Sequence, residues 1–101
     1  MADIDLNADL GETALESDAA LMPYISSANI ACGFHAGDPL YMAGVVDLCN
    51  RHTVAIGAHP SYWDREHFGR RELDIPAAAI YQQTLYQIGA LQAITHSQSA
   101  R

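Results

Sequence analysis

Short apolar runs alternate along this chain with longer segments in which apolar residues recur every three or four positions. Residues 3–7 (DIDLN) alternate polar and apolar side chains, and this pattern predicts a strand. Residues 27–32 (SANIAC) and 53–58 (TVAIGA) are also strand-like, but their residues are mostly small or apolar at every position. Strands that are buried on both faces have this composition, as in a parallel sheet under helices.

Helices are predicted between and after these runs. Residues 18–24 form a short helical pattern that is stopped near Pro23. Asp38 and Pro39 are typical of a helix start, because the carboxylate can cap the first turn and proline suits the first helical position. One face of that helix is apolar through residue 50, and a last, long helix is predicted over 76–97. Their expected packing residues are Met42, Val45, Val46 and Cys49 in the former, and Tyr81, Leu85, Ile88 and Leu91 in the latter.

Three successive strand and helix pairs predict an α/β protein with a parallel sheet and right-handed crossovers. Three such βα units cannot close a barrel, since a barrel of the TIM type needs roughly 250 residues. We therefore expect residues 1–101 to form a single domain, made of the N-terminal three βα units of an incomplete barrel from a longer protein.

The composition and charge of the chain exclude some classes of binding partner. Half of the 101 residues are apolar and the formal net charge is −7, which argues against binding to nucleic acid or to an anionic membrane surface. The first residues, MADIDLNADLGE, are acidic where a signal peptide would be basic. Cys32 and Cys49 lack a metal-type spacing, so reduced thiols in a cytoplasmic protein are expected.

Polar residues follow each predicted strand. Because the carboxyl ends of parallel strands point the same way, these groups should meet on the face where active sites of α/β proteins are built. Two residues follow each strand in turn: Asp9 and Glu12, His35 and Asp38, and His59 and Asp64.

Asp9, His35 and His59 are the candidates for the reaction centre. Two imidazoles and one carboxylate form a ligand set that suits zinc or another divalent ion such as magnesium. Without a metal, the same three residues would act as acid, base and polar contacts to a substrate. Glu12 is interpreted as a solvated loop carboxylate.

Asn7, Asp38 and Arg70 are the candidates for substrate contacts. The alternative for Asp38 is a purely structural helix cap. Arg70 and Arg71 form a basic pair suited to carboxylate or phosphate, and the alternative is a salt bridge to Asp64 or Glu66. Neither common glycine-rich phosphate cradle, G-x-x-x-x-G-K-[ST] or G-x-G-x-x-G, occurs in the sequence.

Four blocks of the chain, in this order, resemble the LamB/YcsF family, whose members are the first of the three subunits of bacterial 5-oxoprolinase. The blocks are DLNADLGE (5–12), SANIACGFHAGD (27–38), VAIGAHPSYWDREHFGRR (54–71) and LYQIGAL (85–91). The resemblance implies a seven-stranded, TIM-like barrel related to glycoside hydrolases and polysaccharide deacetylases. Family members continue with a fourth strand that carries histidine and lysine residues.

The resemblance also implies an activity. It is the ATP-dependent hydrolysis of 5-oxo-L-proline (pyroglutamate) to L-glutamate, with ATP as co-substrate and with 5-oxoprolinase subunits B and C as partners. The sequence leaves open two other interpretations, a metal-dependent hydrolase or deacetylase acting on amides or carbohydrates, and an inactive fragment or partner-binding module. Assembly into a homo-oligomer is open as well.

Overall fold

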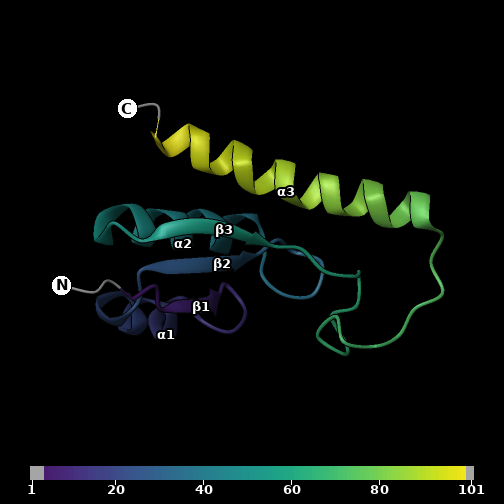
Figure 1. The fold of residues 1–101 in the computed structure, drawn as a ribbon, viewed down its shortest axis with the longest axis horizontal. Coiled ribbons are helices and arrows are strands. Elements are labelled where there is room, and N and C mark those ends of the chain that lie inside the picture. The colour runs from purple at the N-terminus through teal and green to yellow at the C-terminus, as the bar shows by residue number, and fades with distance from the viewer. Residues whose placement is uncertain (1–3, 100–101) are drawn as a thin grey trace.

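The computed structural model describes residues 4–99, and its elements alternate along the chain as the sequence predicts (Figure 1). Each strand is followed by a helix, and a 3₁₀ turn, η1 (Met22–Tyr24), continues the first helix. The strands are β1 (Asn7–Leu10), β2 (Ser27–Ala31) and β3 (Ala55–His59), and the helices are α1 (Leu15–Leu21), α2 (Pro39–His52) and α3 (Ala77–Ser99).

The three strands form one parallel sheet in the order β1-β2-β3. Asn7 pairs with Ser27, and Ser27 pairs with Ala55, so the strands begin level with one another. Their carboxyl ends are therefore level too and open onto the same edge. The long loop between β3 and α3 lies beyond this edge, at the right in Figure 1. The predicted α/β class with parallel strands is confirmed.

The first strand begins later than predicted. The pattern indicated residues 3–7, but the ladder starts at Asn7, and residue 3 lies outside the described part of the chain. Ile4 and Leu6 are exposed, so their alternation with polar residues does not reflect burial. Leu10 is the residue of β1 that enters the core, and Gly11, in a left-handed conformation, ends the strand.

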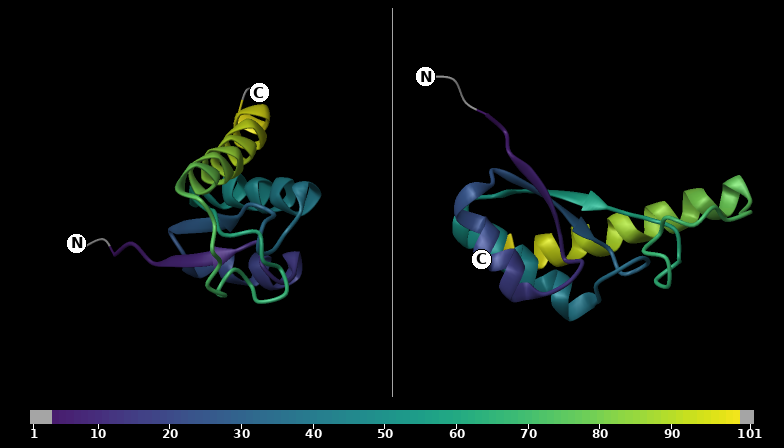
Figure 2. Two further views of the ribbon diagram at one scale, coloured as in Figure 1. Left: turned by 90° about the vertical axis from the view of Figure 1, so that its right-hand side faces the viewer. Right: turned by 90° about the horizontal axis from the view of Figure 1, so that it is seen from below.

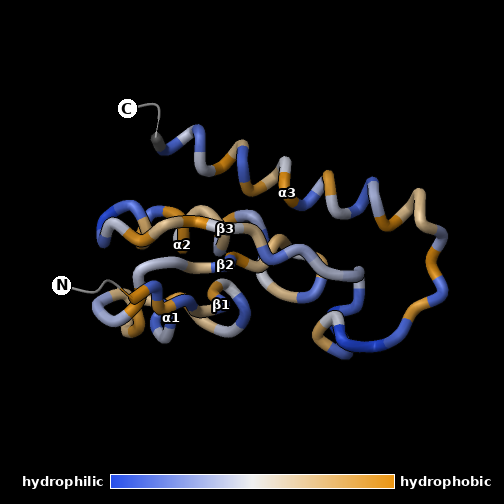
Figure 3. The backbone as a smooth tube through the Cα atoms, in the orientation of Figure 1, coloured by the Kyte–Doolittle hydropathy of each residue, from blue (hydrophilic) through white to orange (hydrophobic). Residues whose placement is uncertain are grey.

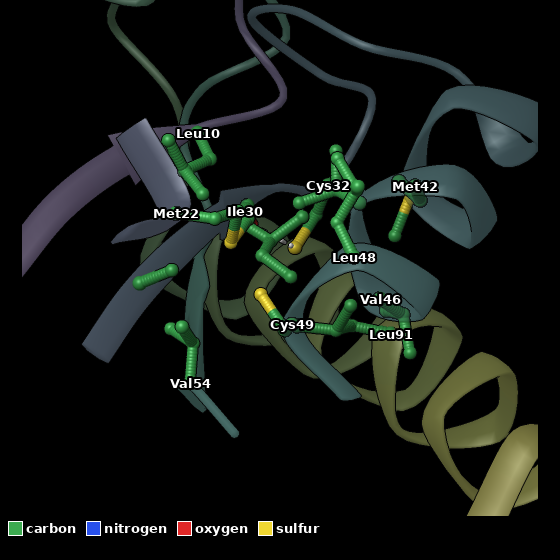
Figure 4. Packing of buried hydrophobic residues seen from close by; sticks show 12 residues of the cluster. Leu10, Met22, Ile30, Cys32, Met42, Val46, Leu48, Cys49, Val54 and Leu91 are labelled. Atoms are coloured by element: carbon green, nitrogen blue, oxygen red, sulfur yellow. Dashed lines mark hydrogen bonds between the residues drawn. The ribbon is translucent and has the colours of Figure 1, made fainter. Parts of the chain in front are cut away.

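Helix α2 packs against one face of the sheet and provides much of the core (Figure 4). The side chain of Asp38 caps it, accepting a hydrogen bond of 2.8 Å from the backbone N–H of Tyr41. The predicted apolar face is confirmed, because Met42, Val45, Val46 and Cys49 are all buried. They pack with Leu10 and Ile30 of the sheet and Leu91 of α3.

The other face of the sheet carries polar and small side chains. Asn29 donates hydrogen bonds of 3.1 Å to Asn7 and 3.5 Å to Asp9 across this face, and Gly57 lies beside Asn29 on β3. The helices gather on the opposite side (Figure 2). The expectation that β3 is buried on both faces is therefore wrong, since Ala55 is exposed and residues 56–59 are half-buried.

Helix α3 was correctly expected, but its predicted packing face was not. Tyr81 is 65% exposed, and Leu85 and Ile88 are also exposed, while Leu91 and the polar Gln87 are buried. The helix extends past the end of the sheet, so its first turns lie beyond the strands, near the loop that follows β3 (Figure 1). Hydrophobic residues continue along this projecting part (Figure 3). No helix within residues 4–99 is both long and apolar enough to cross a bilayer.

Candidate active site

The ends of the three strands meet at the carboxyl edge of the sheet, and one candidate side chain lies at or after each end. Glu12 follows β1 directly after the Gly11 turn, His35 lies in the loop between β2 and α2, and His59 is the last residue of β3. The level register of the strands places these three positions next to one another.

Glu12 lies between the two imidazoles. Its Oε2 is 2.8 Å from Nε2 of His35 and 3.4 Å from Nδ1 of His59. The two imidazole rings are 4.7 Å apart between centroids. His35 is buried, and the Glu12 side chain is only 17% exposed. The interpretation of Glu12 as a solvated loop carboxylate is therefore wrong.

Asp9 stays at the margin of this group. Its Oδ1 lies 3.8 Å from Nδ1 of His59, on the polar face of the sheet, and half of the side chain is exposed. The structure thus brings together His35 and His59, as predicted, but it is Glu12 rather than Asp9 that contacts both. Spacing along the chain could not identify Glu12, because the left-handed turn at Gly11 directs it back over the sheet edge.

The Glu12, His35 and His59 side chains have the donor atoms of a metal site. One ligand atom from each lies within 4.8 Å of the others. Nδ1 of His59, which faces Glu12, is buried without a partner in hydrogen-bond geometry, and this is costly for a polar atom unless a ligand satisfies it. Two imidazole nitrogens and one carboxylate oxygen form a set that zinc accepts. The residues therefore fit a divalent ion.

A pocket of about 370 Å³ opens beside this group. Its wall includes Glu12, His35, Asp38, Tyr41, Arg65 and Phe68. Asp38 caps α2 and also lies in the pocket wall, and its contact with a substrate stays a prediction.

The other two predicted substrate contacts are not in this wall. Asn7 lies at the start of β1, the opposite end of the strand, and donates a 2.9 Å hydrogen bond to Oγ of Ser27. The guanidinium carbon of Arg70 lies over the Phe68 ring, 5.6 Å from its centroid.

Arg65 is the cation at the pocket, and the sequence analysis did not select it. Its guanidinium donates a 2.8 Å hydrogen bond to the carbonyl of Gly33 and another to the carbonyl of Gly37. It therefore ties the loop after β3 to the loop that carries His35. The three arginines within residues 65–71 look alike in sequence, so only the fold separates their roles.

Asp64 does not join the site but holds the loop after β3. Its buried carboxylate forms a 3.0 Å ion pair with Arg71 and accepts hydrogen bonds from the backbone N–H groups of His67 and Arg71. Burial alone would raise the pKa of Asp64, but these hydrogen bonds and the charge of Arg71 outweigh it and leave the pKa below its usual value. The structural alternative stated for the Arg70–Arg71 pair is thus confirmed for Arg71.

Comparison with known proteins shows which family this chain resembles. A family model described as the LamB/YcsF family matches residues 4–101. The crystal structure of a lactam utilization protein from Thermus thermophilus is similar to this chain, with a TM-score of 0.91 and 44% sequence identity. The match covers 97% of this chain and 41% of that one, so this chain spans less than half of that protein's length.

Proposed function

Because this chain belongs to the LamB/YcsF family, we propose that it provides part of the active site of an ATP-dependent 5-oxoprolinase. In this proposal the three βα units are the N-terminal portion of a seven-stranded, TIM-like barrel. The substrate is 5-oxo-L-proline, ATP is the co-substrate, and subunits B and C are the partners. The similar Thermus thermophilus structure, described as a lactam utilization protein, supports a lactam as the substrate class.

The chemistry explains why ATP is needed. A five-membered lactam is a stable amide whose carbonyl carbon is a poor electrophile. Transfer of the γ-phosphoryl group of ATP to the lactam oxygen gives ADP and turns that oxygen into a leaving group. A first water adds to the activated carbon and loses a proton, and the C–N bond breaks as the ring nitrogen takes up a proton, which leaves the side-chain carboxyl as an acyl phosphate. A second water then displaces phosphate and gives L-glutamate. The site must supply a base for the water and a proton for the ring nitrogen.

The convergence of Glu12, His35 and His59 is the observation that carries this proposal. Glu12 and His35 are already joined by a short hydrogen bond, so a proton can pass between them. We assign Glu12 as the base that accepts a proton from water and His35 as the partner that holds or returns it. His59 and Asp9 line the same edge and would contact the reacting amide.

A divalent ion fits the same residues. Glu12, His35 and His59 would hold it, and when bound it would supply Lewis acidity toward the amide carbonyl. This ligand group also favours a second candidate function, a metal-dependent hydrolase or deacetylase that acts on amides or carbohydrates without ATP. The two candidates differ in whether product release depends on ATP.

The test assays the protein with subunits B and C for release of L-glutamate from 5-oxo-L-proline, with and without ATP. We expect the variants Glu12→Gln and His35→Ala to lose activity by about 100-fold or more, because general acid–base groups contribute at least that much. Asp47→Asn is the matched control, since Asp47 forms an ion pair with Arg51 on the surface of α2. Near-normal turnover by His35→Ala would overturn the assignment. Turnover that needs a divalent metal but no ATP would favour the second candidate.

A further inference from the structure

Asp18 is a buried carboxylate that the proposed reaction does not use. It lies in the first turn of α1 and is only 4% exposed. Within residues 4–99 it forms no ion pair with Lys, Arg or His. A buried carboxylate without a cation is costly, so its hydrogen bonds must compensate for the lost hydration.

Two groups donate to the same oxygen of Asp18. The backbone N–H of Gly11 lies 3.1 Å from Oδ2, and the hydroxyl of Tyr41 lies 2.6 Å from it. Gly11 is the residue before Glu12, and Tyr41 lies in the wall of the pocket beside Glu12 and His35. Asp18 lies outside the candidate active site but contacts it at two points. It binds the main chain just before Glu12, and it binds Tyr41 in the pocket wall.

The turn at Gly11 is held by a hydrogen bond at one of its peptide groups and is closely approached by the main chain at the other. Asp18 accepts from the N–H of Gly11, which belongs to the peptide that joins Leu10 to Gly11. The carbonyl of Gly11, in the next peptide, lies against Gly37, where an added Cβ would come within 2.9 Å of it. Gly11 has a φ of 77°, in the left-handed region that favours glycine. The main chain entering Glu12 thus has little freedom to move.

Tyr41 completes the arrangement. Burial, followed by the hydrogen bond and the charge of Asp18, raises the pKa of Tyr41 above its usual value, so the phenol stays protonated as a donor. Its backbone N–H is held by the cap residue Asp38. Asp18 is consequently linked to the start of α2 as well as to the end of β1.

We propose that Asp18 is a positioning residue for Glu12. By holding the Gly11 amide, it directs the Glu12 carboxylate toward His35 and His59 instead of into solvent. This inference depends on the proposed function only in taking Glu12 as part of the working centre. Outer partners that orient ligating groups typically change metal affinity by about 10- to 100-fold when they are lost.

The test uses the 101-residue protein, Zn²⁺ as the probe, and two readouts. Calorimetry measures the zinc dissociation constant, and imidazole ¹⁵N NMR without metal reports the hydrogen bond between His35 Nε2 and Glu12. We expect Asp18→Ala to weaken zinc binding by about 10- to 100-fold and to shift the His35 Nε2 signal toward that of Glu12→Gln. Asp18→Asn keeps an oxygen that can accept both hydrogen bonds, so it should restore both readouts to within a few-fold of wild type. Asp47→Ala, which removes a surface carboxylate, should change neither.

The outcomes separate this inference from the proposed function. A folded Asp18→Ala variant with an unchanged His35 signal and unchanged zinc affinity would overturn the positioning role. If the wild-type protein binds no zinc, a zinc site at Glu12, His35 and His59 is excluded. The ¹⁵N signal of His35 then tests the positioning role of Asp18 by itself. If Asp18→Ala does not fold, hydrogen exchange of the wild-type Gly11 amide decides. This amide follows the end of β1, and we expect slow exchange, whereas exchange as fast as in an open loop would overturn the proposal.

Discussion

At the scale of single residues, the conformation of the loop after β3 depends on the charge of Asp64. The carboxylate pairs with Arg71 and accepts from two backbone N–H groups of the same loop. That loop also carries Arg65, which binds the loop of His35. The ionised form of Asp64 therefore helps to hold the wall of the candidate active site.

We predict a pH dependence for this contribution. Because the pKa of Asp64 is lower in the folded protein than in the unfolded chain, its ionised form stabilises the fold above about pH 4, and this is lost as the pH falls through the lower, folded pKa. Asp64→Asn should be less stable than wild type at pH 7, with a difference that shrinks toward about pH 3. Thermal unfolding of both proteins at several pH values measures it.

Asp74→Asn is the matched control, because Asp74 is exposed near the end of the same loop. Its difference from wild type should stay small over the same range of pH. A difference for Asp64→Asn that remains constant over this range would contradict the prediction.

Residue-level reasoning from the sequence identified the histidines but not their carboxylate. His35 and His59 follow strands, and this position is visible in the pattern. The choice between Asp9 and Glu12 depends on the backbone turn at Gly11 and on its hydrogen bond to Asp18, and the hydrophobic pattern shows neither of them. The role of Arg65 was missed for the same reason, because its partners are carbonyl groups far away along the chain.

At the scale of elements, a polar side chain anchors α3 to the start of the loop that follows β3. Gln87 is fully buried. Its side chain accepts a 2.9 Å hydrogen bond from the N–H of Ser61 and donates one of 2.8 Å to the carbonyl of the same residue. Hydrophobic periodicity cannot predict such a contact, because it counts Gln87 as a solvent-facing residue. The predicted packing face of α3 was wrong because it left out Gln87.

We predict that Gln87→Leu destabilises the protein by about 1–3 kcal/mol, because it leaves two backbone groups of Ser61 without their partners. Chemical denaturation measures the free energy of unfolding. Gln92→Leu, at an exposed position of the same helix, is the control and should change it by less than about 0.5 kcal/mol. Equal effects of the two substitutions would show that Gln87 has no special anchoring role.

At the scale of the whole molecule, the order of elements and the parallel sheet could be predicted, but the burial of each face could not. The Cα radius of gyration is 14.1 Å, against about 13 Å for a compact domain of this length. The excess reflects α3, which extends beyond the sheet (Figure 1). Apolar patterning indicates that a residue has a partner surface, but it does not say whether that surface belongs to the same 101 residues.

We predict that the two halves of α3 differ in stability. The second half packs through Leu91 and Ile94, and Gln98 donates a 2.9 Å hydrogen bond to the carbonyl of Ala43. The backbone amides of residues 81–86 should therefore exchange with solvent about ten times faster, or more, than those of residues 88–95. Hydrogen exchange followed by NMR measures this. Uniform protection along the helix would contradict it and would indicate that the projecting part is covered, as by a second copy of the chain.

The middle strand ends in a small residue, Ala31, and this has a consequence for how the site tolerates substitution. Neighbouring strands lie about 4.8 Å apart, so the backbones of β1 and β3 are separated by about 10 Å, and side chains from both must span that gap above β2. Ala31, which pairs with His59, is fully buried and adds only a methyl group at this point. A bulky residue at position 31 would increase the distance between the Glu12 carboxylate and the His59 imidazole without changing either side chain. Loss of function would thus follow from a few added carbon atoms at a position outside the group of Glu12, His35 and His59.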